Sequence, residues 1–148
     1  MNPQLNLPQA SLKMKSDQVW DRLRKRYVPF TPEEWVRQHF ISYLIDHLGY
    51  PEGRMASEYT VAYNGMKKRC DIVCFDAALQ PYFIVECKSP NIQISQDTFY
   101  QIARYASSLK AQMLILTNGL NHYCAQIEIL ENKLIYLEEI PNYVRVTD

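Results

Sequence analysis

Residues 82–88, YFIVECK, are apolar along most of their length and then present Glu86 and Lys88. A strand that is covered on both faces reads as a nearly continuous apolar run. Because side chains alternate along a strand, Glu86 and Lys88 share one face and Cys87 points to the other. The segment therefore predicts a central strand of a covered sheet, with charged side chains near its end.

The segments around this strand predict helices and further strands. Thr31 precedes Pro32, Glu34 follows three residues later as in a capping box, and apolar residues recur at i+4 spacing up to Gly49. This pattern predicts a helix of four to five turns. Asn64 and Gly65 form a strong turn signal between two period-2 runs, so the flanking segments should pair as a hairpin. A second helix is predicted over 95–110, and strands over 57–65, 67–75, 111–119, 122–129 and 133–140.

The predicted order of elements is α-β-β-β-α-β with extra C-terminal strands, which indicates an α/β fold with a mixed sheet flanked by helices. A chain of 148 residues, 47% of them hydrophobic, has the length of one ordinary domain. We expect residues 1–15 to form a flexible arm and residues 16–148 a single domain. At the start of that domain, Val19, Leu23 and Tyr27 recur at i+4 spacing and predict a short helix over 16–27.

Composition excludes some classes of protein and indicates the cellular compartment. The 16 Lys and Arg residues equal the 16 Asp and Glu residues, which excludes a protein that grips nucleic acid over its whole surface. The four cysteines lack zinc-site spacing and are expected to be buried free thiols, as in a reducing compartment. No apolar run approaches the length of a membrane span or of a secretory signal. We therefore expect a cytoplasmic protein without membrane contact.

Charged side chains gather where two strands are expected to pair. Asp71 leads the strand that precedes YFIVECK, so it should lie beside Glu86, with Lys88 two positions further on. Two carboxylates at close range repel each other unless a divalent cation neutralises them, and hard oxygen ligands select Mg²⁺ or Mn²⁺. The alternative is a buried ion pair between Lys88 and one of the carboxylates.

These residues resemble the PD-(D/E)xK nuclease superfamily, in which an Asp begins one strand and E-x-K lies near the end of the next. Here the signature is Asp71 with Glu86-Cys87-Lys88, and Cys70 replaces the Pro that names the superfamily. The chain most resembles the N-terminal nuclease domain of type I restriction enzyme R subunits, in its stand-alone bacterial form. The stretches that carry this resemblance are TPEEWVRQHFISYLIDHLGYP, KKRCDIVCFD, YFIVECKSP, ISQDTFYQIARY and ILTNGLNHY.

The resemblance implies a restriction-endonuclease-like core and metal-dependent hydrolysis of DNA. Asp71, Glu86 and the backbone carbonyl of Cys87 would hold Mg²⁺ or Mn²⁺, and Lys88 would orient or deprotonate the attacking water. Gln101 in the second helix matches a Gln that related nucleases place beside the active site, although a surface position is equally compatible with the sequence. The basic residues before Asp71 would contact phosphates or simply lie on a solvated hairpin: Lys67, Lys68 and Arg69.

An acidic residue of the first helix completes many such sites, and two candidates stand side by side. At about 100° per residue, Glu33 falls near the middle of the apolar stripe and Glu34 toward its edge. Glu34 also has a role as the capping-box acid. The resembling E-x-V-R-Q text centres on Glu34, so both residues remain candidates.

The remaining alternatives concern partners. These 148 residues contain no G-x-x-x-x-G-K-[ST] phosphate loop, so we expect either an independent endonuclease or one that a separate motor or specificity protein delivers to DNA. A non-catalytic module that uses the same fold to bind nucleic acid or protein is the second hypothesis. A homodimer is the third, formed through a Tyr-rich C-terminal region: Tyr123, Tyr136 and Tyr143.

Overall fold

The computed structural model describes residues 3–144 except 129 and 132, so the ends of the expected arm (1–2) and domain (145–148) lie outside the described residues. After an N-terminal hairpin, the observed elements follow the order expected from the sequence. The bounds are β1 (Met14–Lys15), β2 (Gln18–Asp21), β3 (Arg26–Pro29), α1 (Pro32–Ser42), β4 (Met55–Tyr63), β5 (Met66–Phe75), β6 (Pro81–Cys87), α2 (Gln96–Ser108), β7 (Met113–Thr117), β8 (His122–Glu128) and β9 (Lys133–Leu137).

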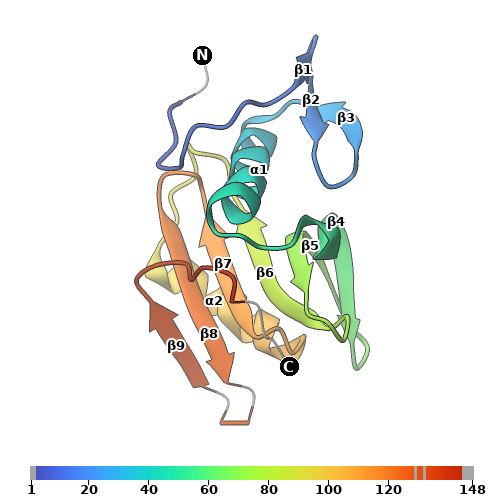
Figure 1. Cartoon of the computed structure of the whole chain (residues 1–148). Coiled ribbons are helices and arrows are strands. Elements are labelled where there is room, and N and C mark those ends of the chain that lie inside the picture. Colours follow the sequence, from blue (N-terminus) through green and yellow to red (C-terminus); the bar gives the residue numbers. More distant parts are fainter. Residues whose placement is uncertain (1–2, 129, 132, 145–148) are drawn as a thin grey trace.

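The main sheet runs β4-β5-β6-β7-β8-β9 in space (Figure 1). Its β6–β7 pair is parallel and its other pairs are antiparallel, so the sheet is mixed, as predicted. The hairpin at Asn64-Gly65 joins β4 to β5, and β6 lies inside the sheet with Phe83 to Cys87 buried. These observations confirm the predicted α/β fold and are consistent with a restriction-endonuclease-like core.

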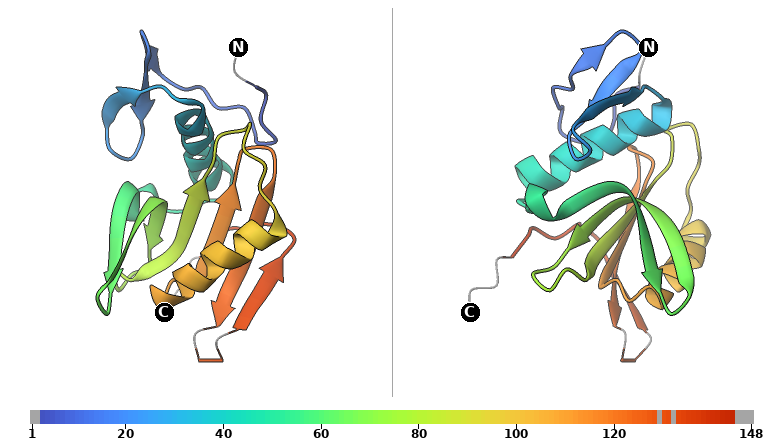
Figure 2. Two further views of the ribbon diagram at one scale, coloured as in Figure 1. Left: turned by 180° about the vertical axis from the view of Figure 1, so that it is seen from behind. Right: turned by 90° about the vertical axis from the view of Figure 1, so that its right-hand side faces the viewer.

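The two helices lie on opposite faces of the sheet (Figure 2). On the α1 face, Val36 and Phe40 pack with the alternate β6 residue Val85 in one buried cluster. On the α2 face, Phe99 and Ala103 belong to a second buried cluster together with β6 and β7 residues. Because both faces of β6 are covered, its apolar sequence follows from its position.

Helix α1 begins as the capping signal predicts. Thr31 Oγ1 accepts a hydrogen bond from the backbone N–H of Glu34 at 3.0 Å, and Pro32 occupies the first turn. After Ser42 the chain continues into a π-helical turn, Tyr43–His47, before Gly49 reverses it with φ of +79°. The predicted extent is confirmed, whereas the π-helical turn has no signal in the apolar spacing. A short 3₁₀ turn, Glu52–Arg54, then leads into β4.

The predicted helix over 16–27 is wrong, because β1, β2 and β3 form a three-stranded antiparallel sheet there. Val19 stands opposite Val28 and both are buried, so the apolar pattern is that of a hairpin. Asp21 Oδ1 accepts backbone N–H groups of two residues in the following turn, at 2.8 and 3.1 Å. An Asp side chain that satisfies the backbone in this way favours a turn over a helix.

The N-terminal segment also contributes to the core. Leu5 is 9% exposed and contacts Gly119, where a Cβ added to the glycine would come within 2.7 Å of Leu5 Cδ2. Gly119 has φ of +85°, so both its backbone conformation and this close approach require glycine. The segment before β1 is therefore anchored on the tip of the main sheet, and its Pro3 carbonyl also accepts a hydrogen bond from Trp35 of α1 at 3.3 Å.

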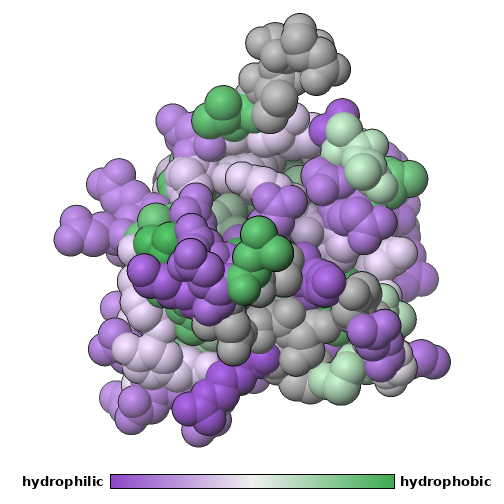
Figure 3. All heavy atoms as spheres, turned by 90° about the horizontal axis from the view of Figure 1, so that it is seen from below, coloured by the Kyte–Doolittle hydropathy of each residue, from purple (hydrophilic) through white to green (hydrophobic). Residues whose placement is uncertain are grey.

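The tyrosines of the predicted homodimer surface are packed within the chain. Each C-terminal tyrosine packs against a ring of the same chain: Tyr123 on Phe99, Tyr136 on Tyr100, and Tyr143 on Tyr50. Seen from below, single hydrophobic residues and small groups of them lie among hydrophilic ones (Figure 3). The homodimer stays a prediction. Among the described residues, no helix combines the length and apolar character that crossing a bilayer requires.

Candidate active site

The candidate site lies where β5 and β6 part from each other. Their antiparallel ladder ends at the pair Ile72–Val85, and the same register places Asp71 opposite Glu86 at the next position. There Asp71 Oδ2 accepts a hydrogen bond from the backbone N–H of Cys87 at 2.7 Å. A side chain thus replaces the backbone ladder, and the two predicted carboxylates come together at the opening.

Glu86 is a buried carboxylate in an unfavourable environment. Its residue is 7% exposed, and its Oε1 lies 3.2 Å from Lys68 Nζ as an ion pair. Oε1 has no hydrogen-bond partner of good geometry among the described residues. Burial, followed by the negative charge of Asp71, raises the pKa of Glu86 to about 7, although Lys68 acts in the opposite direction. A proton or another cation is therefore favoured at this carboxylate near neutral pH.

Arg37 of α1 connects the carboxylates around the opening. Its side chain is 5% exposed, and burial would lower its pKa, but the neighbouring charges of Glu34 and Asp71 raise the pKa above its usual value. A buried guanidinium with several anionic neighbours is a fixed positive charge that positions them. Its nitrogen-to-oxygen distances are 2.6 Å to Glu58, 3.3 Å to Asp71, 3.5 Å to Glu34 and 3.6 Å to Glu33.

The two acidic candidates of α1 have different environments. The Glu34 carboxylate is 8% exposed and is bound by Arg24 at 3.3 Å and by Gln38 at 3.0 Å. The Glu33 carboxylate is 44% exposed, so the helical projection that put Glu33 nearer than Glu34 to the middle of the buried stripe is wrong, while both residues remain candidates for the site. Glu33 is nevertheless close enough to the site for the charged residues there to shift its pKa. Burial and the charge of Asp71 raise its pKa, and Lys88 has a lowering effect.

Lys88 follows the end of β6, and its backbone N–H donates to the carbonyl of Thr117 at 2.8 Å. Within the described chain, Asp71 forms its ion pair with Arg37 and Glu86 forms its own with Lys68, so neither carboxylate is paired with Lys88 as the buried ion-pair alternative requires. The Cys87 side chain is buried on the α1 face of the sheet, and burial raises the pKa of its thiol. The thiol is therefore protonated and uncharged at neutral pH.

The other predicted residues are distributed around the opening. Lys68 pairs with Glu86, and Arg69 pairs with Glu58. Lys67 is exposed on β5, opposite Ala62 of β4. Gln101 is exposed on α2, and its neighbour Ile102 borders a cavity of about 10 Å³ that Lys68 and Glu86 also line.

A comparison with protein family models identifies the family of the chain. The family model described as the type I restriction enzyme R protein N terminus matches residues 32–141, from α1 through β9. The chain belongs to this family. A search of the curated proteins finds no match. The family region contains Glu33, Asp71, Glu86 and Lys88, whereas the β1–β3 sheet precedes it.

Several residues that surround the candidate site are absent from the sequence prediction. Arg37 had a usable signal, because it stands three and four residues after the acidic pair of α1, the spacing of helical neighbours. Glu58 had none, since it reaches the site from a bend in β4 where its own φ is +54°. Arg24 comes from the hairpin that apolar spacing alone predicts as a helix.

The side chains at the opening are of a kind that a divalent cation can use as ligands. Asp71 and Glu86 offer two hard carboxylate donors, and the buried Oε1 of Glu86 lacks a well-aligned hydrogen bond within the described chain. Within the part of the chain that the structure describes, no group of three or more His, Cys, Asp or Glu side chains is placed to hold a metal ion. A cation here would therefore take its remaining ligands from backbone carbonyls, water or substrate, as Mg²⁺ commonly does.

Proposed function

We propose that this chain is a divalent-metal-dependent nuclease that hydrolyses phosphodiester bonds of DNA. The observation that carries the proposal is the close approach of Asp71 and Glu86 at the opening of β5 and β6, where Glu86 is buried and its pKa is raised to about 7. Membership in the restriction enzyme R protein family supports the reaction class and the connection to DNA.

Each residue of the opening has a role in this proposal. Asp71 and Glu86 would hold Mg²⁺ or Mn²⁺, with the backbone carbonyl of Cys87 as a further ligand. When bound, the metal supplies Lewis-acid activation of the phosphate and lowers the pKa of bound water. Lys88 orients the attacking water and stabilises the negative charge that develops on the phosphate. Glu33 is the more exposed of the two acidic residues of α1, and the charges of Asp71 and Lys88 act on its pKa.

The surrounding ion pairs hold this arrangement in place. Arg37 fixes one Asp71 oxygen, and the backbone N–H of Cys87 fixes the other, so the orientation of the carboxylate is set from two sides. Lys68 offsets the charge of Glu86 when no metal is bound. These contacts preorganise the oxygens before substrate arrives, which is how a site of this kind lowers its reorganisation energy.

The test is cleavage of supercoiled plasmid DNA with Mg²⁺ or Mn²⁺. We expect nicked or linear product with the wild type and none with the double variant Asp71→Asn, Glu86→Gln. Glu138→Gln is the matched control, because it removes an exposed carboxylate outside the opening. Calorimetry with Mn²⁺ should show binding to the wild type and to the control, and none to the double variant.

The result also separates this proposal from the second hypothesis, a non-catalytic binding module. If the wild type cuts no better than the double variant and binds no Mn²⁺, the nuclease proposal fails. Retained DNA binding by both proteins would then favour the module. Lys88→Ala distinguishes metal binding from chemistry. The variant should lose cleavage activity but keep its Mn²⁺ affinity within about twofold, because the substitution removes no oxygen that binds the metal.

A further inference from the structure

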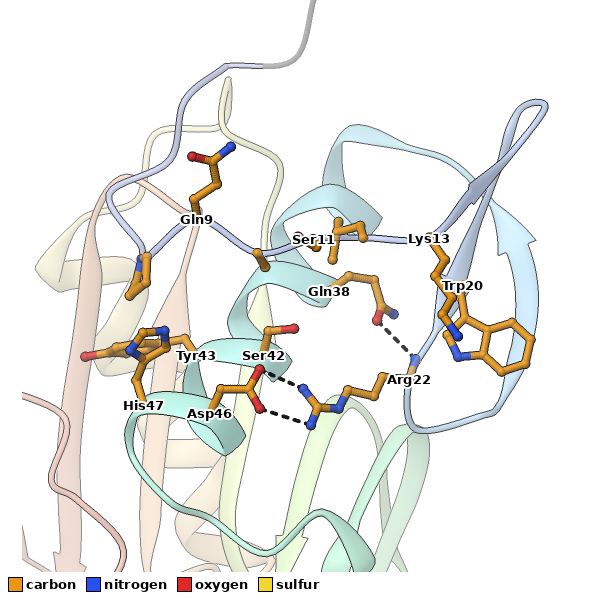
Figure 4. Close-up of a pocket in the computed structure, with 13 residues that line it drawn as sticks. Gln9, Ser11, Lys13, Trp20, Arg22, Gln38, Ser42, Tyr43, Asp46 and His47 are labelled. Carbon is orange, nitrogen blue, oxygen red and sulfur yellow. Dashed lines mark hydrogen bonds and ion pairs between the residues drawn. The ribbon is translucent and has the colours of Figure 1, made fainter.

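A second candidate site lies at the N-terminal sheet, outside the family region. A cavity of about 460 Å³ lies between residues 8–13, β2 and the C-terminal end of α1 with its π-helical turn (Figure 4). Trp20 and Lys13 stand at one end of it, and Tyr43 and His47 at the other. Its volume is in the range of small-molecule sites and accommodates a nucleotide.

The β1–β3 sheet presents two different faces. Val19 and Val28 form the buried pair, so the next pair in register, Trp20 and Tyr27, points the other way. The two rings meet edge to face with their centroids 5.1 Å apart. Trp20 also lines the cavity, so this aromatic pair continues the cavity wall onto the surface.

Two exposed lysines lie over these rings. Lys13 Nζ is 5.6 Å from the centroid of Trp20, and Lys15 Nζ is 5.7 Å from the centroid of Tyr27. Both lysines come from the strand edge beside β2 and are exposed. We call Lys13, Lys15, Trp20 and Tyr27 the aromatic–basic face. Aromatic rings beside exposed cations are the combination that binds unpaired bases and their phosphates.

The floor of the cavity is already neutralised, which leaves Lys13 as its cation among the lining residues. Arg22 makes two bonds to Asp46, at 2.9 and 3.0 Å (Figure 4). It makes a further bond to Glu52, at 3.1 Å. Its guanidinium is therefore a structural link between β2 and the π-helical turn. A bound anion would meet Lys13 at the mouth of the cavity, next to Trp20.

The distribution of charge along the chain favours a polyanion at this face. Residues 1–31 contain six basic and two acidic residues, whereas residues 32–148 contain ten basic and fourteen acidic residues. The region that precedes the family match is thus positive, and the region that contains the proposed active site is negative. Arg22, Arg24 and Lys25 of the first region pair with carboxylates of the second, so the positive charge that a nucleic acid strand would meet beside the rings comes from Lys13 and Lys15.

We propose that the aromatic–basic face and the adjoining cavity bind a single strand of nucleic acid. Bases stack on Trp20 and Tyr27, phosphates contact Lys13 and Lys15, and the cavity holds one unpaired nucleotide. Single strands are selected over duplex because the rings contact base faces, which duplex stacking hides. The inference rests on the proposed function in one respect: the aromatic–basic face would hold a strand for the proposed nuclease, at a place separate from its metal centre.

The test is fluorescence anisotropy with a labelled oligothymidylate in EDTA, so that binding is measured without cleavage. The variants are Lys13→Ala with Lys15→Ala, Trp20→Leu, and the control Lys133→Ala at the exposed β9 edge. Loss of two phosphate contacts should reduce the slope of log K against log salt by about 1.4. Trp20→Leu should weaken binding about tenfold and remove the quenching of tryptophan fluorescence by the strand.

Circular dichroism of each variant verifies the fold. Equal affinity for duplex and single strand, or an effect of Lys133→Ala as large as that of the lysine pair, would overturn the inference. The outcome is separable from the nuclease test, because Asp71→Asn should bind the strand like wild type. If plasmid is cut but the lysine variant binds normally, this inference alone fails. If binding depends on the face and nothing is cut, the proposed function alone fails.

Discussion

Replacement of Glu86 by Gln should stabilise the protein at alkaline pH and have little effect in acid. The pKa of this carboxyl rises from its ordinary 4.5 to about 7 in the folded chain, through burial and the charge of Asp71. Between these two values the folded state retains a proton that the unfolded state releases. Stability therefore falls as pH rises through this window. The amide of the Glu86→Gln variant would remain neutral at every pH, so the variant would not lose this stability.

The size of the effect follows from the pKa of Glu86. At about 1.4 kcal/mol per pH unit, a rise from 4.5 to about 7 corresponds to about 3 kcal/mol when the window is fully crossed. Because pH 5 already lies inside the window, the advantage of Glu86→Gln should grow by about 2 to 3 kcal/mol between pH 5 and pH 8. The proton belongs to the Asp71–Glu86 pair as a unit, so the midpoint is a property of the pair.

The assay is urea unfolding followed by tryptophan fluorescence at pH 5, 6, 7 and 8. Glu138→Gln is the control for the loss of one negative charge at an exposed position. Mn²⁺ at saturation should raise the stability of the wild type at pH 8 and leave Glu86→Gln unchanged. A difference between Glu86→Gln and wild type that is constant with pH would refute the argument that a buried, repelled carboxylate lies at this position.

Three further predictions concern the same framework. Arg37→Met removes the buried cation that pairs with the buried carboxylate of Glu34 and the half-buried ones of Asp71 and Glu58, and should lower the free energy of unfolding by about 3 kcal/mol in urea titrations, more than Arg37→Lys. Lys68→Met removes the charge that opposes protonation of Glu86, so calorimetric Mn²⁺ binding should shift to higher pH. Gly119→Ala forces a left-handed backbone and a clash with Leu5, and should lower stability by about 1 to 3 kcal/mol in thermal unfolding, with part of the loss recovered when Leu5→Ala is added.

The sequence predicts the main sheet well because its signals are local. A turn dipeptide, a capping residue and an uninterrupted apolar strand each depend on a few neighbouring residues, and their order determines how the sheet is built. The pairing of Asp71 with Glu86 follows from the same register. The hairpin at 14–29 is different, because Val19, Leu23 and Tyr27 fit a helical period equally well. Only the burial of Val19 against Val28 and the turn at Asp21 decide between the two.

The surroundings of the site depend on contacts between distant segments. Glu58 reaches Arg37 through a bend in β4. The residues around Glu58 give no sequence signal for the positive φ of this glutamate. Glu34 is buried because Arg24 from the β2–β3 turn covers it. Helical projection alone placed Glu33 on the buried side, since it took account of apolar neighbours but not of a basic partner from another element.

The N-terminal hairpin is therefore part of the structural support of the site, although the family region begins at residue 32. Asp21 accepts a hydrogen bond from Ser57 of β4 at 2.7 Å and pairs with Arg24. Arg24 in turn contacts Glu34, and Arg37 links Glu34 to the Asp71 carboxylate. Each member is anchored by an oppositely charged or hydrogen-bonded neighbour, so a change at the hairpin acts on the orientation of the predicted metal ligand. The same hairpin carries the aromatic–basic face, which places strand binding and support of the site on one element.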